Sequence, residues 1–203
     1  MPTIKDIETL RQIIGQPRPL TSFKIQKRLN STAQAFIRHS PLLLLATSNQ
    51  RGEATVSPKG DHPGFVFIQD DSTLCVPERQ GNKLIFSLQN IIENPQVGLL
   101  FIVPGTAETL RVQGIAELTD DEELCSKLSA RGKAALLVTK VKVTECYFHC
   151  AKAFLRGSVW QPESWAQPIK ISFGKEIACN TDLKEDDIRE LDGGGEKRYV
   201  RDL

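Results

Sequence analysis

Apolar residues near the start of the chain recur at three- and four-residue steps, which is the spacing of one face of an α-helix. The first run ends at Pro17-Arg18-Pro19, and a second run over residues 29–37 ends before Ser40-Pro41. Helical conformations are disfavoured for the residue before a proline, so each helical run should end where its proline occurs. The pattern predicts two helical stretches between residues 4 and 39.

From residue 42 the pattern changes to short apolar runs separated by turn residues, which indicates strands and hairpins. Seven strands are predicted, over residues 42–46, 54–58, 65–68, 73–76, 97–103, 108–118 and 135–147. Two helices interrupt them, one over residues 82–93 and a short one that Thr119 or Asp120 caps and that reaches about Arg131. Because there is no strand–helix–strand rhythm, we expect a mainly β fold, an antiparallel six- or seven-stranded barrel with helical additions.

The chain after Cys150 carries less regular signals. A short helix is predicted over residues 151–157, then an irregular segment with Trp160 and Trp165, an acidic helix over residues 183–192 and a flexible Gly-rich tail. We therefore divide the chain into an N-terminal helical arm (1–39), a barrel domain (40–165) and a C-terminal extension (166–203).

Composition and charge argue against several classes of function. The 203 residues include 26 Lys+Arg and 25 Asp+Glu, a net charge of +1, which gives no global basic field for nucleic acid. The longest apolar run, residues 42–46, is far short of the ~20 residues that cross a bilayer, and no apolar leader is present. Five scattered cysteines without a CxxC pair indicate reduced thiols. We expect a cytoplasmic protein without nucleic-acid or membrane partners.

The segment over residues 77–83, between a predicted strand and a predicted helix, carries Arg79, Asn82 and Lys83. A helix start offers unpaired N–H groups and a positive dipole end, so these residues could bind a phosphate. The alternative is a polar loop with solvated charges in which Asn82 caps the helix.

Two strands carry further polar candidates. Ser57 and Lys59, either side of Pro58, point the same way and could reach a ligand beside the first cluster, although the same residues also fit a turn. Thr109, Arg111 and Gln113 share one face of a later strand, where polar groups inside a barrel mouth could bind a flat heterocycle. Any half-solvated strand shows that same pattern.

The segment after the last strand offers cations and aromatic rings. Lys152 and Arg156 are four residues apart and so share a helix face, and Trp160 follows them. They could cover a ligand or a partner subunit, or the tryptophan could simply anchor the segment to the core. Cys146 and His149 point to opposite faces of a strand, so we expect no metal site.

Several classes of enzyme lack their signatures. The chain has no GxSxG, GxGxxG or GxxxxGK[ST] sequence, which argues against serine hydrolases, nicotinamide dehydrogenases and P-loop proteins.

Seven segments together resemble a known family. They are Ser40–Thr47 with Gly52, Ser57-Pro58-Lys59-Gly60-Asp61, Pro63-Gly64-Phe65-Val66, Arg79-Gln80-Gly81-Asn82-Lys83, residues 90–101, Thr109-Leu110-Arg111-Val112 and residues 149–154. The chain is similar over roughly residues 36–165 to the pyridoxamine 5'-phosphate oxidase-related, FMN-binding split-barrel superfamily, and most to a branch of FMN-dependent proteins whose substrate is unassigned.

The resemblance implies a split barrel that forms a homodimer with FMN at the subunit interface. By motif it assigns the cofactor contacts: the FMN phosphate to Arg79, Asn82 and Lys83, the flavin side to Ser57, Pro58 and Lys59, the ring or ribityl chain to Thr109 and Arg111, and the arm from the second subunit to Lys152, Arg156 and Trp160. It assigns no catalytic residue.

The implied function is that of an FMN-dependent oxidoreductase acting on an unidentified small molecule. The alternative is a flavin- or haem-binding protein without turnover. The oxidase's C-terminal Arg-Leu-x-Pro ending is absent, which argues against pyridoxamine 5'-phosphate as the substrate.

Overall fold

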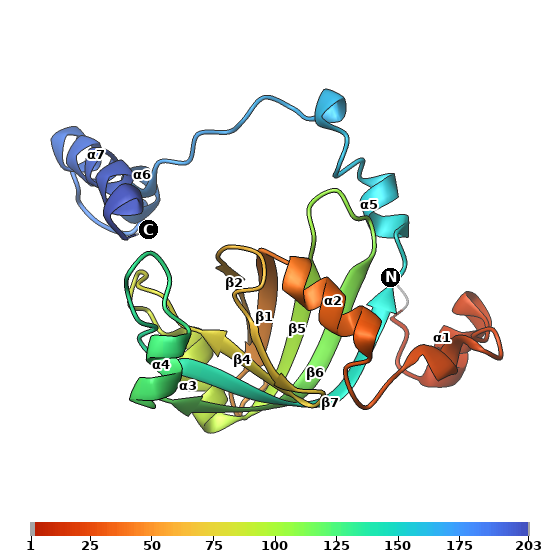
Figure 1. Ribbon diagram of the computed structural model, residues 1–203. Helices are drawn as coiled ribbons and strands as arrows, with labels where there is room; N and C mark the ends of the chain where they lie inside the picture. Colours follow the sequence, from red (N-terminus) through yellow and green to blue (C-terminus); the bar gives the residue numbers. More distant parts are fainter. Residues whose placement is uncertain (1–2, 203) are drawn as a thin grey trace.

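The computed structural model describes residues 3–202, with the side chains of residues 3–194. Its strands form one antiparallel sheet in the order β2-β1-β5-β6-β7-β4-β3 (Figure 1). The strands are β1 (Leu42–Ser48), β2 (Ala54–Gly60), β3 (Phe67–Asp70), β4 (Thr73–Pro77), β5 (Gln96–Ile102), β6 (Thr109–Thr119) and β7 (Val138–His149). The prediction of a mainly β, antiparallel, seven-stranded fold is confirmed.

Strand alternation separates an inner face from an outer face. Leu43 and Leu45 of β1 are buried, and so are Leu110 and Val112 of β6. The helix α2 (Ser31–His39) adds Ile37 and other residues to this core, and it packs against β6 and β7. The core therefore includes the end of the segment that we expected to be an N-terminal arm, although the division into domains itself stays a prediction.

The barrel is closed on one side by side chains rather than by a strand ladder. β2 and β3 are the two edges of the sheet, and β3 is only four residues long, so it leaves the end of β4 without a partner strand. There Lys59 of β2 forms an ion pair with Glu78, and Asp61 forms one with Arg79. We call this contact between the end of β2 and the segment that follows β4 the seam.

Two interior helices differ from their predicted limits. α3 is Phe86–Glu93 and not residues 82–93, because Lys83 and Ile85 adopt positive φ angles of 62° and 50° that a helix does not allow. α4 is Glu122–Lys127, and its cap is Asp121, whose side chain accepts from the Leu124 amide, rather than Thr119 or Asp120.

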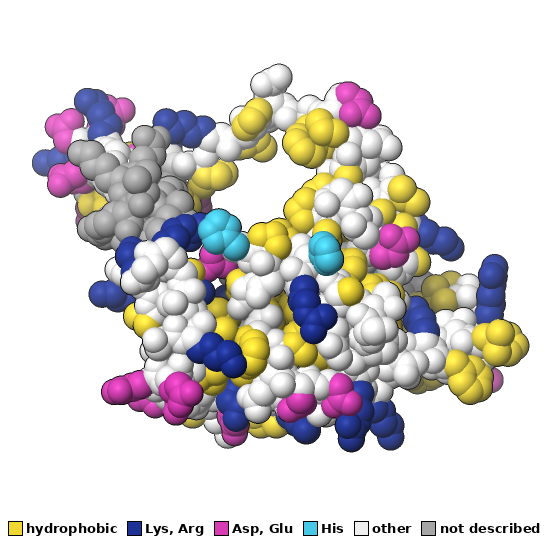
Figure 2. Space-filling model, in the orientation of Figure 1, with side chains coloured by type: hydrophobic (Ala, Val, Ile, Leu, Met, Phe, Trp, Pro, Cys, Tyr) yellow, Lys and Arg dark blue, Asp and Glu magenta, His cyan; other side chains and the backbone are white. Residues whose placement is uncertain are grey.

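The terminal segments lie outside the barrel. The helix α1 (Ile7–Ile14) has no buried residue, a short turn η1 (Thr21–Lys24) follows it, and exposed apolar side chains gather on this segment (Figure 2). After β7 come α5 (Lys152–Arg156), a turn η2 (Pro162–Ser164) and the helices α6 (Phe173–Ala178) and α7 (Glu185–Asp202), which pack on each other. No described helix is both long and apolar enough to cross a bilayer.

The expected flexible tail is part of α7. The helix continues through Gly193 and the glycines after it, although each glycine in a helix interior costs about 1 kcal/mol relative to alanine. The side chains from residue 195 onward lie outside the described part.

Candidate functional site

Six of the predicted site residues line one cleft beside the seam. The cleft has a volume of about 710 Å³, within the range of small-molecule sites. These residues are Ser57, Pro58, Lys59, Arg79, Asn82 and Lys83. The expectation that the Ser57–Lys59 strand lies beside the residue 77–83 segment therefore agrees with the geometry, while the role of these residues as cofactor contacts stays a prediction.

Two of the three cations in the cleft already have partners. Lys59 Nζ donates to both carboxylate oxygens of Glu78, one of them at 2.7 Å. Arg79 Nε donates to Asp61 at 2.9 Å, and its Nη1 donates to the Leu128 carbonyl at 2.8 Å. These contacts fix both side chains against the wall of the cleft and leave part of their hydrogen-bonding capacity for a ligand.

The Asp61 carboxylate is almost fully buried, with 3% of its side chain exposed. Burial alone would raise the pKa of this carboxyl, but the His62 amide and the guanidinium groups of Arg79 and Arg131 outweigh it and hold the pKa below its ordinary value. Asp61 is therefore a charged anchor of the seam at neutral pH.

Lys83 differs from the other two cations. Its side chain is exposed, and no ion pair with another described residue holds it. Its neighbour Asn82 accepts from the Leu84 amide at 3.1 Å through Oδ1, which leaves the amide Nδ2 of Asn82 free to donate to a ligand. Lys83 and Asn82 are thus the groups most available for a phosphate.

The start of α3 also lines the cleft, through Phe86, Ser87 and Leu88. The amides of Leu88 and Gln89 both donate to the Ile85 carbonyl, so they begin the helical hydrogen bonds. The earlier amides precede that ladder and can face an anion. The helix start that we expected at Asn82 is therefore present at the cleft, four residues later.

Apolar side chains also line the cleft. Leu84, Ile85, Leu136 and Leu137 line it, and the side chain of Leu136 is 62% exposed. A cleft lined by both cations and apolar side chains suits a ligand that has an anionic group and a flat apolar body.

Thr109 and Arg111 do not line the cleft, and Thr109 is buried; their role as cofactor contacts stays a prediction. Leu110 and Val112 face the core, so alternation turns Arg111 and Gln113 to the outer face of the sheet. There Arg111 borders a shallow hollow of about 520 Å³.

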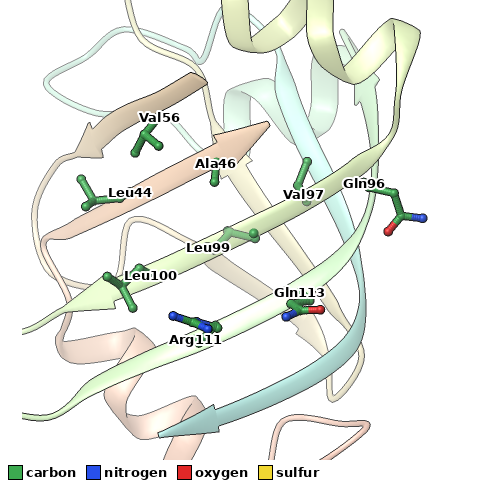
Figure 3. A pocket seen from close by; sticks show the side chains of 10 residues that line it. Leu44, Ala46, Val56, Gln96, Val97, Leu99, Leu100, Arg111 and Gln113 are labelled. Carbon is green, nitrogen blue, oxygen red and sulfur yellow. The ribbon is translucent and has the colours of Figure 1, made fainter. Parts of the chain in front are cut away.

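Apolar residues make up most of that hollow. Leu44, Ala46, Val56 and Leu100 come from three neighbouring strands and surround Gly98, and Figure 3 shows them on the same side of the sheet as Arg111. Val56 is 62% exposed, which is unusual for a valine in a strand. We call this surface the outer face.

The predicted arm residues form a third group. Lys152 and Arg156 are exposed on α5. Trp160 donates from Nε1 to the Thr106 carbonyl at 2.8 Å, and its ring is 5.6 Å from that of Phe154. The tryptophan thus anchors the arm to the loop between β5 and β6 in its own chain, while its contact with a ligand or a partner subunit stays a prediction.

Sequence reasoning missed Glu78 and Tyr147. Glu78 belongs to the segment 77–83, in which the sequence predicts only Arg79, Asn82 and Lys83 as ligand contacts. Tyr147 accepts a hydrogen bond from Arg111 at 2.9 Å, and its position opposite Arg111 in the register of β6 and β7 could have been found only from the strand pairing.

The cysteine and histidine pair near the end of β7 stays apart. Cys146 is buried and its Sγ lies 3.2 Å from the Arg28 carbonyl, while His149 is exposed. Burial raises the pKa of the Cys146 thiol, so the thiol is protonated at neutral pH. Over the described residues, no three His, Cys, Asp or Glu side chains group together as metal ligands.

Comparisons with known proteins agree with this fold. Residues 29–150, more than half of the chain, match the family model described as pyridoxamine 5'-phosphate oxidase. The chain is similar in structure to HupZ from Group A Streptococcus, with 19% sequence identity and a TM-score of 0.50, over 60% of this chain and 99% of that one. No curated protein matches the chain.

Two further solved structures are similar over most of their own length. One is a candidate pyridoxamine 5'-phosphate oxidase from Lactobacillus delbrueckii, with 24% identity, a TM-score of 0.47 and coverage of 60% of this chain and 95% of that one. The other is an FMN-binding protein from Syntrophomonas wolfei, with 10% identity, a TM-score of 0.48 and coverage of 71% and 97%.

Proposed function

Because this chain belongs to the pyridoxamine 5'-phosphate oxidase family, we propose that it is an FMN-binding flavoprotein and an FMN-dependent oxidoreductase acting on a small molecule. The family match confirms the resemblance seen in the sequence motifs. The observation that carries the proposal is the cleft beside the seam, which joins a free lysine and a helix start to an apolar wall.

The residues of the cleft fit the cofactor in three respects. Lys83 and the donor of Asn82 suit a terminal phosphate, and the start of α3 adds backbone N–H groups. The apolar wall with Leu136 suits a flat ring system. The volume of about 710 Å³ accommodates a ligand of that size.

When bound, FMN supplies the hydride or electron chemistry, and the protein supplies binding and electrostatics. Lys59 is the cation of β2 that would face the ring, and Glu78 holds its ammonium in place from the other side of the seam. A fixed positive charge there would favour an anionic form of a bound ring.

The outer face supports the second part of the proposal, a homodimer with the cofactor at its interface. Pro58, Leu44, Leu100 and Arg111 lie in one cross-strand row, so Arg111 is three strand spacings, roughly 14 Å, from the cleft strand β2. A single chain therefore does not bring Arg111 and Thr109 to the cleft residues. In a two-fold dimer built on the outer face, Thr109, Arg111 and the arm residues Lys152, Arg156 and Trp160 would complete the partner's site.

The test of the cofactor is an absorbance spectrum of the purified protein before and after addition of excess FMN and its removal. We expect retained flavin bands in the wild type. Lys83→Ala should weaken FMN binding at least tenfold, because one charge-assisted hydrogen bond contributes about 1.5–3 kcal/mol. The exposed Lys175→Ala on α6 is the matched control and should bind as the wild type does.

Each outcome of this test separates two possibilities. A colourless protein after reconstitution removes FMN from the proposal, and a Soret band favours the haem-binding alternative. Full retention in Lys83→Ala would refute the phosphate assignment alone. Consumption of NAD(P)H by the flavin-loaded protein, followed by quinones and dyes as acceptors, separates an oxidoreductase from a flavin carrier.

The dimer is tested by light scattering after size-exclusion chromatography. Leu44→Glu places a charge in the centre of the outer face and should give a monomer that retains less flavin, whereas the exposed Thr144→Glu on β7 should leave the assembly unchanged. A Leu44→Glu protein that stays dimeric would show that the interface lies elsewhere.

A further inference from the structure

A group of cationic and aromatic side chains lies at the end of β6 and β7, away from the cleft. Arg111 Nη1 donates to Tyr147 Oη, and the guanidinium carbon is 5.6 Å from the centre of the Tyr147 ring. Lys24 Nζ is 5.3 Å from the same centre, and the His149 ring is 6.0 Å from it. We call these four residues the outer cluster.

The position of Lys24 is set by the main chain that follows it. Gln26 exchanges two backbone hydrogen bonds with Cys146, of 2.9 and 2.7 Å, and Cys146 directly precedes Tyr147. The side chain of Gln26 also donates to the Phe23 carbonyl at 3.0 Å, which closes the turn that contains Lys24. The lysine is therefore held beside the tyrosine by β-type pairing, although it comes from a segment outside residues 29–150.

The outer cluster has positive charge without a matching carboxylate. Within the part of the chain whose side chains are described, neither Lys24 nor Arg111 forms an ion pair, in contrast to Lys59 and Arg79 at the seam. The acidic residue on this face of β7 is Glu145, which lies opposite Gln113 in the register and pairs with neither cation. Two cations around one ring repel each other unless an anion joins them.

The pKa of the His149 imidazole is affected by the same positive charge. Partial desolvation of the ring lowers the pKa of His149, and the charges of Arg111 and Lys24 lower it further. A histidine whose protonation is opposed by two neighbouring cations lies in a positive local potential. A negative group bound between them would reverse that effect.

We propose that the outer cluster is an anion-binding site that takes the phosphate or carboxylate group of a small molecule. Lys24 and Arg111 supply the charge, and Tyr147 Oη and a ring nitrogen of His149 lie beside it as further hydrogen-bonding groups. The guanidinium has five N–H donors, of which the tyrosine engages one, so donors remain for the anion. The site shares Arg111 with the proposed dimer interface, whereas Lys24, Tyr147 and His149 have no part in the proposed cofactor site, so the test is made through Lys24.

The test is calorimetric titration of the full-length protein with inorganic phosphate and, in a second arm, with acetate, at constant ionic strength. All proteins carry Lys83→Ala, so that phosphate binding in the cleft is weakened and contributes equally to every variant compared. Lys24→Ala should weaken binding about tenfold or more, as expected for loss of one charge-assisted hydrogen bond. The control is Lys27→Ala, an exposed lysine of the same segment that is not one of the two cations over the Tyr147 ring, and it should change binding less than twofold.

A second readout follows the His149 ring by NMR. Saturating phosphate should raise the pKa of His149 in the protein with Lys24, and should do so less in Lys24→Ala. Binding of phosphate alone assigns a phosphate group, and binding of acetate alone or of both anions assigns a carboxylate or a general anion site.

The proposal is wrong if Lys24→Ala binds both anions as well as its parent does, or if Lys27→Ala loses as much affinity. It is also wrong if no binding remains once Lys83→Ala is present, because all anion binding would then belong to the cleft. That last result would leave the proposed flavin function in place. Conversely, anion binding at the outer cluster in a protein that ignores FMN would refute the proposed function and keep this site.

Discussion

The charged anchor at the seam should determine how firmly the barrel closes, and Asp61→Asn tests this. The substitution keeps the shape of the side chain but removes its charge, so that Arg79, with 27% of its side chain exposed, loses its carboxylate partner at 2.9 Å. Breaking a buried ion pair costs about 3–5 kcal/mol, and the partial exposure of Arg79 lowers this to about 2–3 kcal/mol. For a chain of 203 residues that corresponds to a fall in Tm of roughly 6–9 °C.

The assay is urea unfolding followed by circular dichroism, with Asp71→Asn as the matched control. Asp71 pairs with Arg28 at 3.1 Å, but both side chains are exposed, so its loss should cost less than about 1 kcal/mol. Equal losses in the two variants would refute the view that burial makes the seam pair strong.

The pH dependence of Asp61→Asn gives an independent check. Since the folded pKa of Asp61 lies below its ordinary value, its contribution is complete above about pH 4 and is lost as the pH falls through the folded pKa. The stability gap between wild type and Asp61→Asn should therefore be constant from pH 7 to about pH 5 and shrink in acid. A gap that widens in acid would show that another group is responsible.

Three further substitutions test the packing around the site, each by urea unfolding. Gly114→Ala would place a Cβ 2.5 Å from the Lys142 carbonyl oxygen. The clash should push β6 away from β7 and lower the free energy of unfolding by about 3 kcal/mol. An unchanged free energy of unfolding would show that the two strands separate easily there. Asn90→Ala removes a buried amide that donates to the Thr47 hydroxyl at 3.1 Å and should cost about 1–2 kcal/mol. Trp160→Phe removes the 2.8 Å hydrogen bond to the β5–β6 loop and should leave global stability within about 1 kcal/mol while speeding proteolysis after α5.

The order of strands along the chain could be predicted because apolar alternation is local. Both hairpins and all seven strands follow from runs such as residues 42–46 and from the turn residues between them. The start of α3 could not be predicted in this way, since Lys83 and Ile85 adopt left-handed conformations that local sequence disfavours and that only the surrounding fold can impose.

The positions of the site residues could also be predicted only in part from the sequence. Alternation predicts that Thr109 and Arg111 share a face, but which face is inner depends on the strands paired on either side. The cleft residues could be grouped from the sequence, because Ser57–Lys59 and residues 77–83 each lie at the end of a predicted strand. Lys24 carried no signal at all, because its place beside Tyr147 depends on a bridge between residues 26 and 146.

Two cations of the cleft should differ in function: Arg79 stabilises the seam, and Lys83 binds the proposed phosphate. Arg79 donates hydrogen bonds to Asp61 and to the Leu128 carbonyl. Its loss would therefore weaken the contact that closes the barrel and would also remove a ligand contact. Lys83 has no such structural partner, so its loss should affect only the ligand. We therefore expect Arg79→Ala to lower both Tm and FMN affinity, and Lys83→Ala to lower FMN affinity at an unchanged Tm. A fall in Tm of the same size in both ligand-free variants would show that Lys83, too, supports the fold and that the cleft is a structural feature first.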